Sequence, residues 1–222
     1  MSASRFEGAR TAMVLRQLQG RGVRDPRVLE AMGRVPRERF VQPEWLDAAY
    51  EDQPLPIGEG QSISQPWMVA RICELLELGG SERVLDVGAG SGYQSAVLAL
   101  LSRQVVAVER SPRLAQRCRR ALADVGLDEV IVVCGDGSQG RSEFAPYDAI
   151  ACAAAAPRVP APLTEQLADG GRLVLPIGGP RSQTLVRVRR RGARLEEEVL
   201  DPCHFVPLLG RHGYREVAEG EE

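Results

Sequence analysis

The feature that most constrains the fold is a glycine-rich turn between an apolar strand and an apolar helix. The short run Arg83–Val87 ends at Gly88, Gly90 and Gly92, and the apolar segment Tyr93–Leu101 follows directly. Glycines at alternate positions let the backbone reverse sharply and leave its amides open to a ligand. A strand, a turn and a helix in succession begin a βαβ unit, so the pattern predicts a parallel sheet crossed by helices.

The same alternation continues along the chain. Pro66 starts a helix before the glycine turn, and Ser111 with Pro112 starts another after it, running to about Val125. Short apolar segments mark further strands at 104–109, 130–134, 148–152 and 172–177, with a short helix near 163–167. Alternating residues at 184–190 and 195–200 indicate antiparallel strands. The predicted fold class is α/β, with a doubly wound, mostly parallel sheet and an antiparallel C-terminal edge.

The first third of the chain is predicted to be a helical extension of this sheet. Apolar residues at 6, 9, 13, 14 and 18 fall near one helical face, and Asp25 before Pro26 is a favourable helix start. Residues 53–66 are rich in Pro, Gly, Gln and Ser and are expected to form an ordered loop.

Composition excludes several kinds of chemistry. All 28 Lys and Arg residues are arginine, so the chain cannot use a lysine Schiff base or a P-loop phosphate clamp. A net charge of −2 argues against nucleic-acid binding, which needs a basic face. The cationic run Arg189, Arg190 and Arg191 is therefore interpreted as a solvated strand end.

Cysteine and histidine usage argues against a metal site and an oxidising compartment. The five cysteines, at 73, 118, 134, 152 and 203, have no Cys-x-x-Cys spacing and are interpreted as reduced. With two histidines, a structural zinc site is not expected. The N-terminus lacks the apolar core of a signal peptide, and no stretch approaches the roughly 18 residues of a membrane span. We therefore expect a cytoplasmic protein that binds neither membrane nor metal.

Acidic residues lie where an open α/β sheet binds ligands, at the carboxyl ends of successive strands. Asp86 precedes Gly88 by two residues, and Glu109 ends the next strand 23 residues after Asp86. A carboxylate at that spacing suits ribose hydroxyls. Asp136 ends the third strand and is expected to accept from an adenine amino group.

The glycine spacing separates two classes of cofactor. Dinucleotide sites use Gly-x-Gly-x-x-Gly, whereas here the third glycine comes one residue early. Gly-x-Gly-x-Gly after an acid resembles motif I of the class I S-adenosylmethionine methyltransferases. The resemblance implies S-adenosyl-L-methionine as cofactor and S-adenosyl-L-homocysteine as product. The expected cofactor-binding residues are Asp86, Gly88, Ala89, Gly90, Gly92, Glu109, Arg110, Asp136 and Gly137.

The loop before this motif indicates which family of methyltransferases the chain resembles. Residues 55–66, Leu-Pro-Ile-Gly-Glu-Gly-Gln-Ser-Ile-Ser-Gln-Pro, closely resemble the signature of the protein-L-isoaspartate O-methyltransferases. The similarity continues through 84–93, 108–110, 135–137, 145–148, 154–157 and 205–208, and spans roughly 34–210. It implies a Rossmann-like class I methyltransferase fold in one domain, 1–222. This domain divides into a helical extension and substrate loop (1–60), a cofactor-binding core (61–180), antiparallel strands (181–215) and a tail (216–222).

The resemblance implies methyl transfer to the α-carboxylate of L-isoaspartyl residues in damaged proteins and peptides. The ester then closes to a succinimide, whose hydrolysis restores some normal aspartate. The chemistry fits the residues available, because a carboxylate is already ionised at pH 7 and needs no general base. Catalysis by positioning is sufficient.

Carried over to this sequence, Ser64 matches the catalytic serine of the family and is expected to orient the substrate carboxylate. The other expected residues of the substrate loop and its surroundings are Gln61, Ser62, Ile63, His204 and Val206. Without the family resemblance, the two serines are better interpreted as making local turn bonds. The sequence departs from the usual family pattern at Asp86, Ala89, Arg141, Ala153 and His204.

Several other functions stay open at this point. A related carboxyl methyltransferase acting on ordinary aspartate in one dedicated peptide would share these motifs. A catalytically silent S-adenosylmethionine-binding module is disfavoured by the intact Ser64 and the acids. A nicotinamide oxidoreductase is disfavoured by the glycine spacing, and an RNA methyltransferase by the charge and by the lack of an Asn/Asp-Pro-Pro-aromatic motif.

Overall fold

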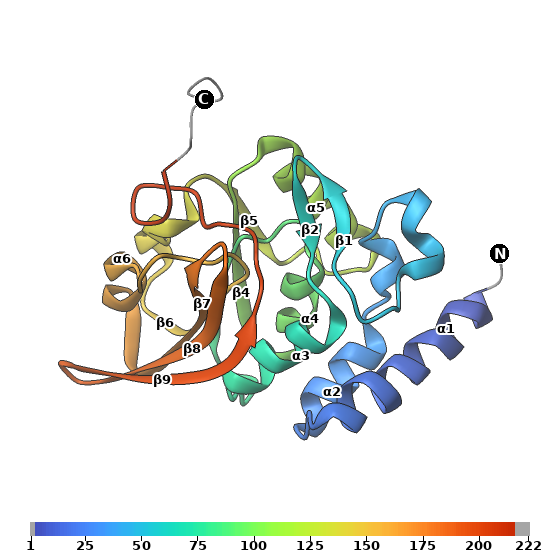
Figure 1. The fold of residues 1–222 in the computed structure, drawn as a ribbon, viewed down its shortest axis with the longest axis horizontal. Helices are drawn as coiled ribbons and strands as arrows, with labels where there is room; N and C mark the ends of the chain where they lie inside the picture. The colour runs from blue at the N-terminus through green and yellow to red at the C-terminus, as the bar shows by residue number, and fades with distance from the viewer. Residues whose placement is uncertain (1–2, 216–222) are drawn as a thin grey trace.

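The structure, a computed structural model, describes residues 3–215 and is built around a seven-stranded sheet (Figure 1). The strand order is β5-β4-β3-β6-β7-β8-β9. Their bounds are β3 Arg83–Val87, β4 Gln104–Glu109, β5 Ile131–Cys134, β6 Tyr147–Cys152, β7 Leu167–Gly179, β8 Ser182–Arg191 and β9 Arg194–Cys203. The pairs from β5 to β7 are parallel, and β7, β8 and β9 pair antiparallel. The predicted fold class is confirmed.

The order of the strands reverses beside β3. After β3 the chain adds β4 and β5 on one side, and then returns to add β6 on the other side. Open α/β sheets bind their ligands at such a reversal, outside the carboxyl ends of the strands. The topology therefore predicts a ligand site at the carboxyl ends of β3, β4 and β6.

Each face of the sheet has its own hydrophobic core. In β4, Val105 and Ala107 belong to one core and Val106 and Val108 to the other. All four side chains are buried, because both faces of the sheet are covered. Strands of this kind are continuous apolar runs in the sequence, which is why their positions could be predicted.

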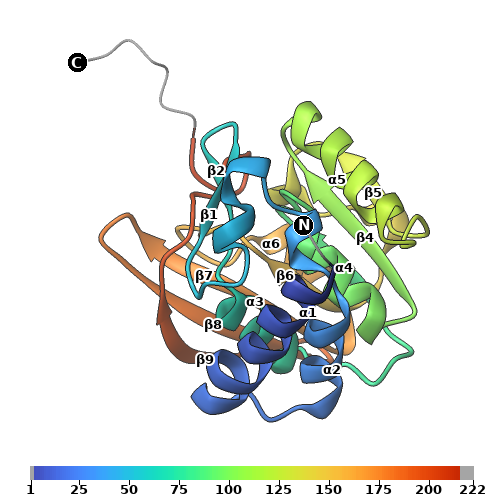
Figure 2. The ribbon, with the colours of Figure 1, turned by 90° about the vertical axis from the view of Figure 1, so that its right-hand side faces the viewer.

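Most of the helices cover one face of the sheet. That face carries α3 (Pro66–Leu75), α4 (Tyr93–Leu101) and α5 (Pro112–Asp124), with α1 (Ala3–Ala12) and α2 (Pro26–Arg34) outside them (Figure 2). The short α6 (Ala161–Glu165) packs on the other face. Two of the predicted helix starts have side-chain caps: Asp25 accepts from the amides of Arg27 and Val28, and Ser111 from that of Leu114.

The predicted loop at 53–66 is wrong in part, because it contains a β-hairpin. β1 (Leu55–Gly58) pairs antiparallel with β2 (Gln61–Ile63), and burial alternates along β1. The turn residues Gly58, Glu59 and Gly60 have φ values of 87°, 54° and 66°. Two glycines make this left-handed turn accessible at low steric cost. The prolines that argued against a helix are tolerated because this two-stranded ribbon consists only of edge strands.

Smaller differences concern the ends of elements. The first helix is α-helical only to Ala12 and continues as a π-helical turn over Met13–Leu18. β7 begins at Leu167 instead of near 172, with an irregularity in its pairing to β6, and α6 accordingly ends at Glu165. No helix within residues 3–215 combines the length and apolar character needed to cross a bilayer. The predicted tail at 216–222 lies outside the described residues.

The three arginines interpreted as a solvated strand end do lie at the end of β8, and they also have partners within the fold. Arg189 pairs with Glu77, with its Nη2 2.5 Å from Oε1. Arg190 donates to the carbonyl of Leu167 at 2.8 Å, and Arg191 pairs with a glutamate of β9. Each of the three side chains has a partner in the fold at the end of β8, which lies between β7 and β9.

A buried arginine joins the N-terminal extension to α4. Arg37 is fully buried; its Nε donates to the carbonyl of Ala49 at 2.8 Å, and its guanidinium lies 4.8 Å from the ring centroid of Tyr93. Among the residues that the structure describes, no group hydrogen-bonds its two terminal nitrogens. Burial lowers the pKa of Arg37 to about 10, against the opposing influence of Tyr93 and Tyr50.

We expect Gly92→Ala to lower the free energy of unfolding by about 2–4 kcal/mol. The backbone at Gly92 has a φ of +91°, and a Cβ there would lie 2.9 Å from the Sγ of Cys118 in α5. Left-handed strain and overpacking each cost on the order of 1–2 kcal/mol. Gly126→Ala is the matched control, because its φ is +73° and its surroundings are open. In urea-induced unfolding, equal losses for the two variants would contradict the contact with α5.

Candidate active site

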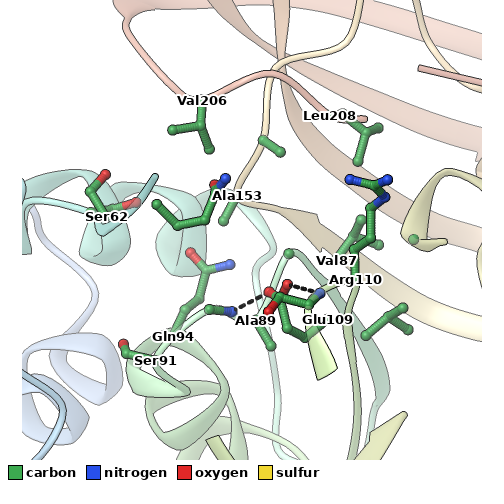
Figure 3. A pocket seen from close by; sticks show the side chains of 18 of the residues that line it. Ser62, Val87, Ala89, Ser91, Gln94, Glu109, Arg110, Ala153, Val206 and Leu208 are labelled. Atoms are coloured by element: carbon green, nitrogen blue, oxygen red, sulfur yellow. Dashed lines mark hydrogen bonds between the residues drawn. The ribbon is translucent and has the colours of Figure 1, made fainter. Parts of the chain in front are cut away.

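A cavity of about 440 Å³ lies at the carboxyl ends of β3 and β4 and beside the end of β6 (Figure 3). The glycine turn, the β1–β2 hairpin and the segment after β9 also contribute to its wall. The expected site residues that line it are Gln61, Ser62, Ile63, Ser64, Gly88, Ala89, Gly90, Glu109, Arg110, Gly137 and Val206. Four expected residues lie outside this lining, namely Asp86, Gly92, Asp136 and His204.

Backbone hydrogen bonds hold the glycine turn against the neighbouring strand. The amides of Gly88 and Ala89 donate to the carbonyl of Val108 at 2.9 and 3.1 Å. Gly88 and Gly90 have φ values of 81° and 54°. A Cβ at Gly90 would also lie 3.1 Å from the Cδ1 of Ile57 in the hairpin. Glycine at residue 90 thus satisfies both the turn and the close approach of β1.

Glu109 connects this turn to the next one. Its Oε2 accepts from the amide of Gly90 and its Oε1 from the amide of Ser111, both at 2.8 Å (Figure 3). The side chain is largely buried but lines the cavity. A carboxylate has about four acceptor positions, so about two stay available for the hydroxyls of a ligand.

Asp86 lies behind the cavity wall. It is fully buried, its Oδ1 accepts from Nε2 of Gln94 at 2.7 Å and its Oδ2 from Oγ of Ser95 at 2.5 Å. This arrangement argues against direct contact with a ligand. Desolvation, helped by the charge of Glu109, raises the pKa of Asp86 to about 6, although its two hydrogen bonds favour the ionised form.

Asp136 is occupied by protein groups. Its Oδ1 accepts from the amide and the hydroxyl of Ser138, and its Oδ2 accepts from Gln139 and from the amide of Arg211. Burial alone would raise its pKa, but these four bonds fill its acceptor positions and hold the pKa below the ordinary value. Asp136 therefore has no free acceptor position for the expected contact with adenine. The next residue, Gly137, does line the cavity.

A second cavity, of about 630 Å³, adjoins the first. The two cavities share the residues Ser62, Ser64, Ala153, Val206 and Pro207. The larger one is also lined by His204, by aromatic side chains and by the turn between β7 and β8. Ser62 and Ser64 therefore stand in a wall common to both spaces.

The hydroxyl of Ser64 is available for a ligand. Within residues 3–215 no hydrogen bond to a protein group is formed by the hydroxyl of Ser64 or by that of Ser62. Local turn bonds, the competing interpretation of these serines, are thus not formed. Nearby, the side-chain amide of Gln61 donates weakly to the carbonyl of Glu59 at 3.4 Å.

The departures from the family pattern fall into two groups. Ala89 and Ala153 line the smaller cavity, and His204 lines the larger one, where it is exposed. Arg141 lines neither; its amide donates to Gln166 at 2.8 Å, and it packs closely against Gly135. Arg141 therefore contributes to the packing of the fold and to neither cavity.

Sequence reasoning missed several lining residues. Glu59, at the hairpin tip, lines the smaller cavity and pairs with Arg113 of α5 at 3.3 Å. Gln94 lines the same cavity, while Trp67 and Tyr214 line the larger one. Gln94 follows the glycine turn by two residues, which is the one local signal that could have indicated it. No cluster of metal-ligating side chains occurs in the described part of the chain.

Comparison with known proteins decides the family. A family model described as protein-L-isoaspartate(D-aspartate) O-methyltransferase (PCMT) matches residues 9–213. The chain belongs to this family. Among curated PCMT relatives, the Methanoregula boonei protein-L-isoaspartate O-methyltransferase is 51% identical over 205 residues, 92% of this chain and 94% of that one. The Marinobacter nauticus protein-L-isoaspartate O-methyltransferase 2 is 52% identical, again over 92% and 94%.

Solved PCMT structures share the fold. One protein-L-isoaspartate O-methyltransferase has a TM-score of 0.83 and 32% identity, covering 92% of this chain and 67% of its own. A Plasmodium falciparum β-aspartate methyltransferase (PCMT), solved in complex with S-adenosyl-L-homocysteine, has a TM-score of 0.75 and 27% identity, covering 88% and 96%. The predicted family is thereby confirmed over most of the chain.

We expect the Asp86→Asn variant to gain stability relative to the parent protein as the pH rises. The folded-state pKa of Asp86 is about 6, above its ordinary value of 3.8. Its protonated form stabilises the fold below pH 3.8, and that contribution is lost as the pH rises through 6. Asparagine cannot ionise, so the difference in unfolding free energy between variant and parent should grow by about 1 kcal/mol from pH 5 to pH 8.

Urea-induced unfolding at both pH values measures this difference. Asp128→Asn, at an exposed turn, is the control and should show no such growth. A difference for Asp86→Asn that is the same at pH 5 and pH 8 would contradict the effect of burial on its carboxylate.

Proposed function

We propose that the chain transfers a methyl group from S-adenosylmethionine to the α-carboxylate of L-isoaspartyl residues, and that Ser64 holds this carboxylate. The observation that carries the role of Ser64 is its place in the wall shared by the two cavities. One cavity offers a nucleoside-binding end, and the other is wide enough for a peptide segment. Methyl transfer between them has to occur beside Ser62 and Ser64.

The smaller cavity fits the cofactor. Glu109 keeps about two acceptor positions free for ribose hydroxyls, and the glycine turn presents its backbone without side chains in the way. A Cβ at Gly137 would lie 2.7 Å from Cγ1 of Val87, so glycine lets this part of the wall pack closely against β3. When bound, S-adenosylmethionine supplies an electrophilic methyl group on a positively charged sulfur.

The residues present suit catalysis by positioning. A substrate carboxylate is ionised at neutral pH and can only accept hydrogen bonds, and the free hydroxyl of Ser64 can donate one. This bond fixes which oxygen faces the methyl group and needs no proton transfer. The lack of a histidine in the shared wall is therefore no obstacle.

The larger cavity suits a peptide substrate. Trp67, Phe205 and Tyr214 give it apolar surface, and the backbone of Gly178 and Gly179 lies at its edge. Apolar surface of this kind does not select one particular side chain, so we expect isoaspartyl proteins and peptides of varied sequence to bind. All five cysteines are free thiols, which fits a reducing, cytoplasmic location.

A pair of peptides that differ only in isoaspartyl or aspartyl linkage tests the substrate. We expect methyl transfer to the isoaspartyl form at a rate at least tenfold higher, measured by release of the labelled methyl group. Equal rates, or transfer only to the aspartyl form, would assign the chain to modification of ordinary aspartate in a dedicated peptide.

We expect Ser64→Ala to lower the turnover number by about 100-fold while the affinity for S-adenosylhomocysteine changes less than threefold. The variant loses the hydroxyl that holds the substrate carboxylate but keeps the cofactor contacts. Steady-state kinetics and calorimetry measure the two effects. Ser81→Ala, in the exposed loop at the amino end of β3 and therefore at the opposite end of that strand from the cavity, is the control. An unchanged turnover number for Ser64→Ala would exclude the role.

A further inference from the structure

An unpaired carbonyl lies in the wall of the cofactor cavity. Gln94, in the first turn of α4, is 6% exposed and lines the cavity, and its Oε1 has no hydrogen-bond partner among the described residues. Figure 3 shows its side chain rising from α4 toward the side of the cavity formed by Ser62 and Ala153. A buried acceptor without a donor is unusual in a folded protein and indicates a ligand.

The orientation of the Gln94 amide follows from its neighbour. Its other end, Nε2, donates to Oδ1 of Asp86 at 2.7 Å, and the second oxygen of Asp86 is held by Ser95. An ionised carboxylate only accepts, so the NH₂ group must face Asp86 and the carbonyl must face away. Asp86, although it cannot reach the cavity, thereby decides which atom Gln94 presents.

The shape of the cavity indicates which part of the cofactor meets this carbonyl. Ser64, in the shared wall, marks the position of the transferred methyl group, and Glu109 and Gly137 mark the nucleoside. On the side of the cavity formed by α3 and the start of α4, the wall includes Val69, Ser91, Tyr93 and Gln94. The amino-acid arm of S-adenosylmethionine is the part left for this wall, and its α-ammonium group is the hydrogen-bond donor on that arm.

We propose that Gln94 binds the α-ammonium group of the cofactor through Oε1 and that Asp86 is a positioning residue acting through Gln94. The proposal rests on the proposed use of S-adenosylmethionine. It gives the buried acid of the glycine motif a function that its burial would otherwise exclude. Because the carboxylate polarises the amide, the carbonyl is a better acceptor for a cation than an isolated glutamine would be.

The test compares two ligands by calorimetry. The first is S-adenosylhomocysteine, and the second is its desamino analogue, in which hydrogen replaces the α-amino group. We expect Gln94→Met to weaken S-adenosylhomocysteine about tenfold and to change the affinity of the analogue less than twofold. Loss of affinity for both ligands by the same factor would show a structural effect and overturn the proposal, as would unchanged affinity for both.

The Asp86→Asn variant tests the positioning role. The amide that this substitution introduces can donate to Oε1 of Gln94, so the glutamine amide can turn and present its NH₂ group to the ammonium, which repels it. We expect the same selective loss for S-adenosylhomocysteine as in Gln94→Met. Unaltered discrimination between the two ligands in Asp86→Asn would overturn this part. Gln104→Met, at the start of β4 and outside the lining of the cofactor cavity, is the control and should leave both affinities unchanged.

Comparison of the ligands within one variant removes effects of stability, since both are measured on the same folded protein. The result is also separate from the methylation assay. Suppose that Gln94→Met loses affinity for S-adenosylhomocysteine alone, while the parent protein transfers no methyl group to the isoaspartyl peptide. That outcome would support the contact of Gln94 with the cofactor and reject the proposed substrate. Failure of the parent protein to bind S-adenosylhomocysteine would overturn both.

Discussion

The site depends on one carboxylate that connects two turns of the chain. Glu109 ends β4 and accepts from the amide of Gly90 in the turn after β3 and from that of Ser111 before α5. Without it, two backbone donors beside the cavity would have no protein acceptor. The spacing between these strand ends is therefore set before a ligand binds, and the ligand meets an acceptor that is already oriented.

The regular part of the fold could be predicted because its signals are local. The bounds of β3, α4 and β4 coincide with the prediction, since each is a buried apolar run that ends at a turn. The β1–β2 hairpin was missed, because its prolines and glycines suggested a loop while its alternating burial extends over only a few residues. Its strands are too short for periodicity alone to distinguish them from a loop.

The site was predictable where the backbone forms it and less so where side chains do. Gly88, Gly90 and Glu109 line the cavity because a strand end leaves little freedom in their placement. Asp86 and Asp136 are engaged elsewhere. Asp136 accepts from the amide of Arg211, a partner 75 residues away that no local pattern indicates. For the same reason Gln94 was overlooked, since its significance depends on a buried neighbour.

The absence of lysine determines how the charges of this protein respond to alkaline pH. A lysine loses its charge near pH 10.4, whereas an exposed guanidinium stays protonated above pH 12, so the surface ion pairs of this chain persist in strongly alkaline solution. Arg37 is the exception, because burial lowers its pKa to about 10 against the opposing influence of Tyr93, whose ring lies beside it. Because the fold lowers this pKa, the unfolded chain binds more protons than the folded one above about pH 10, so the titration of Arg37 favours the folded state there. The first guanidinium to lose its charge therefore lies in the interior, where the N-terminal extension meets α4, and this loss of charge does not itself destabilise the fold.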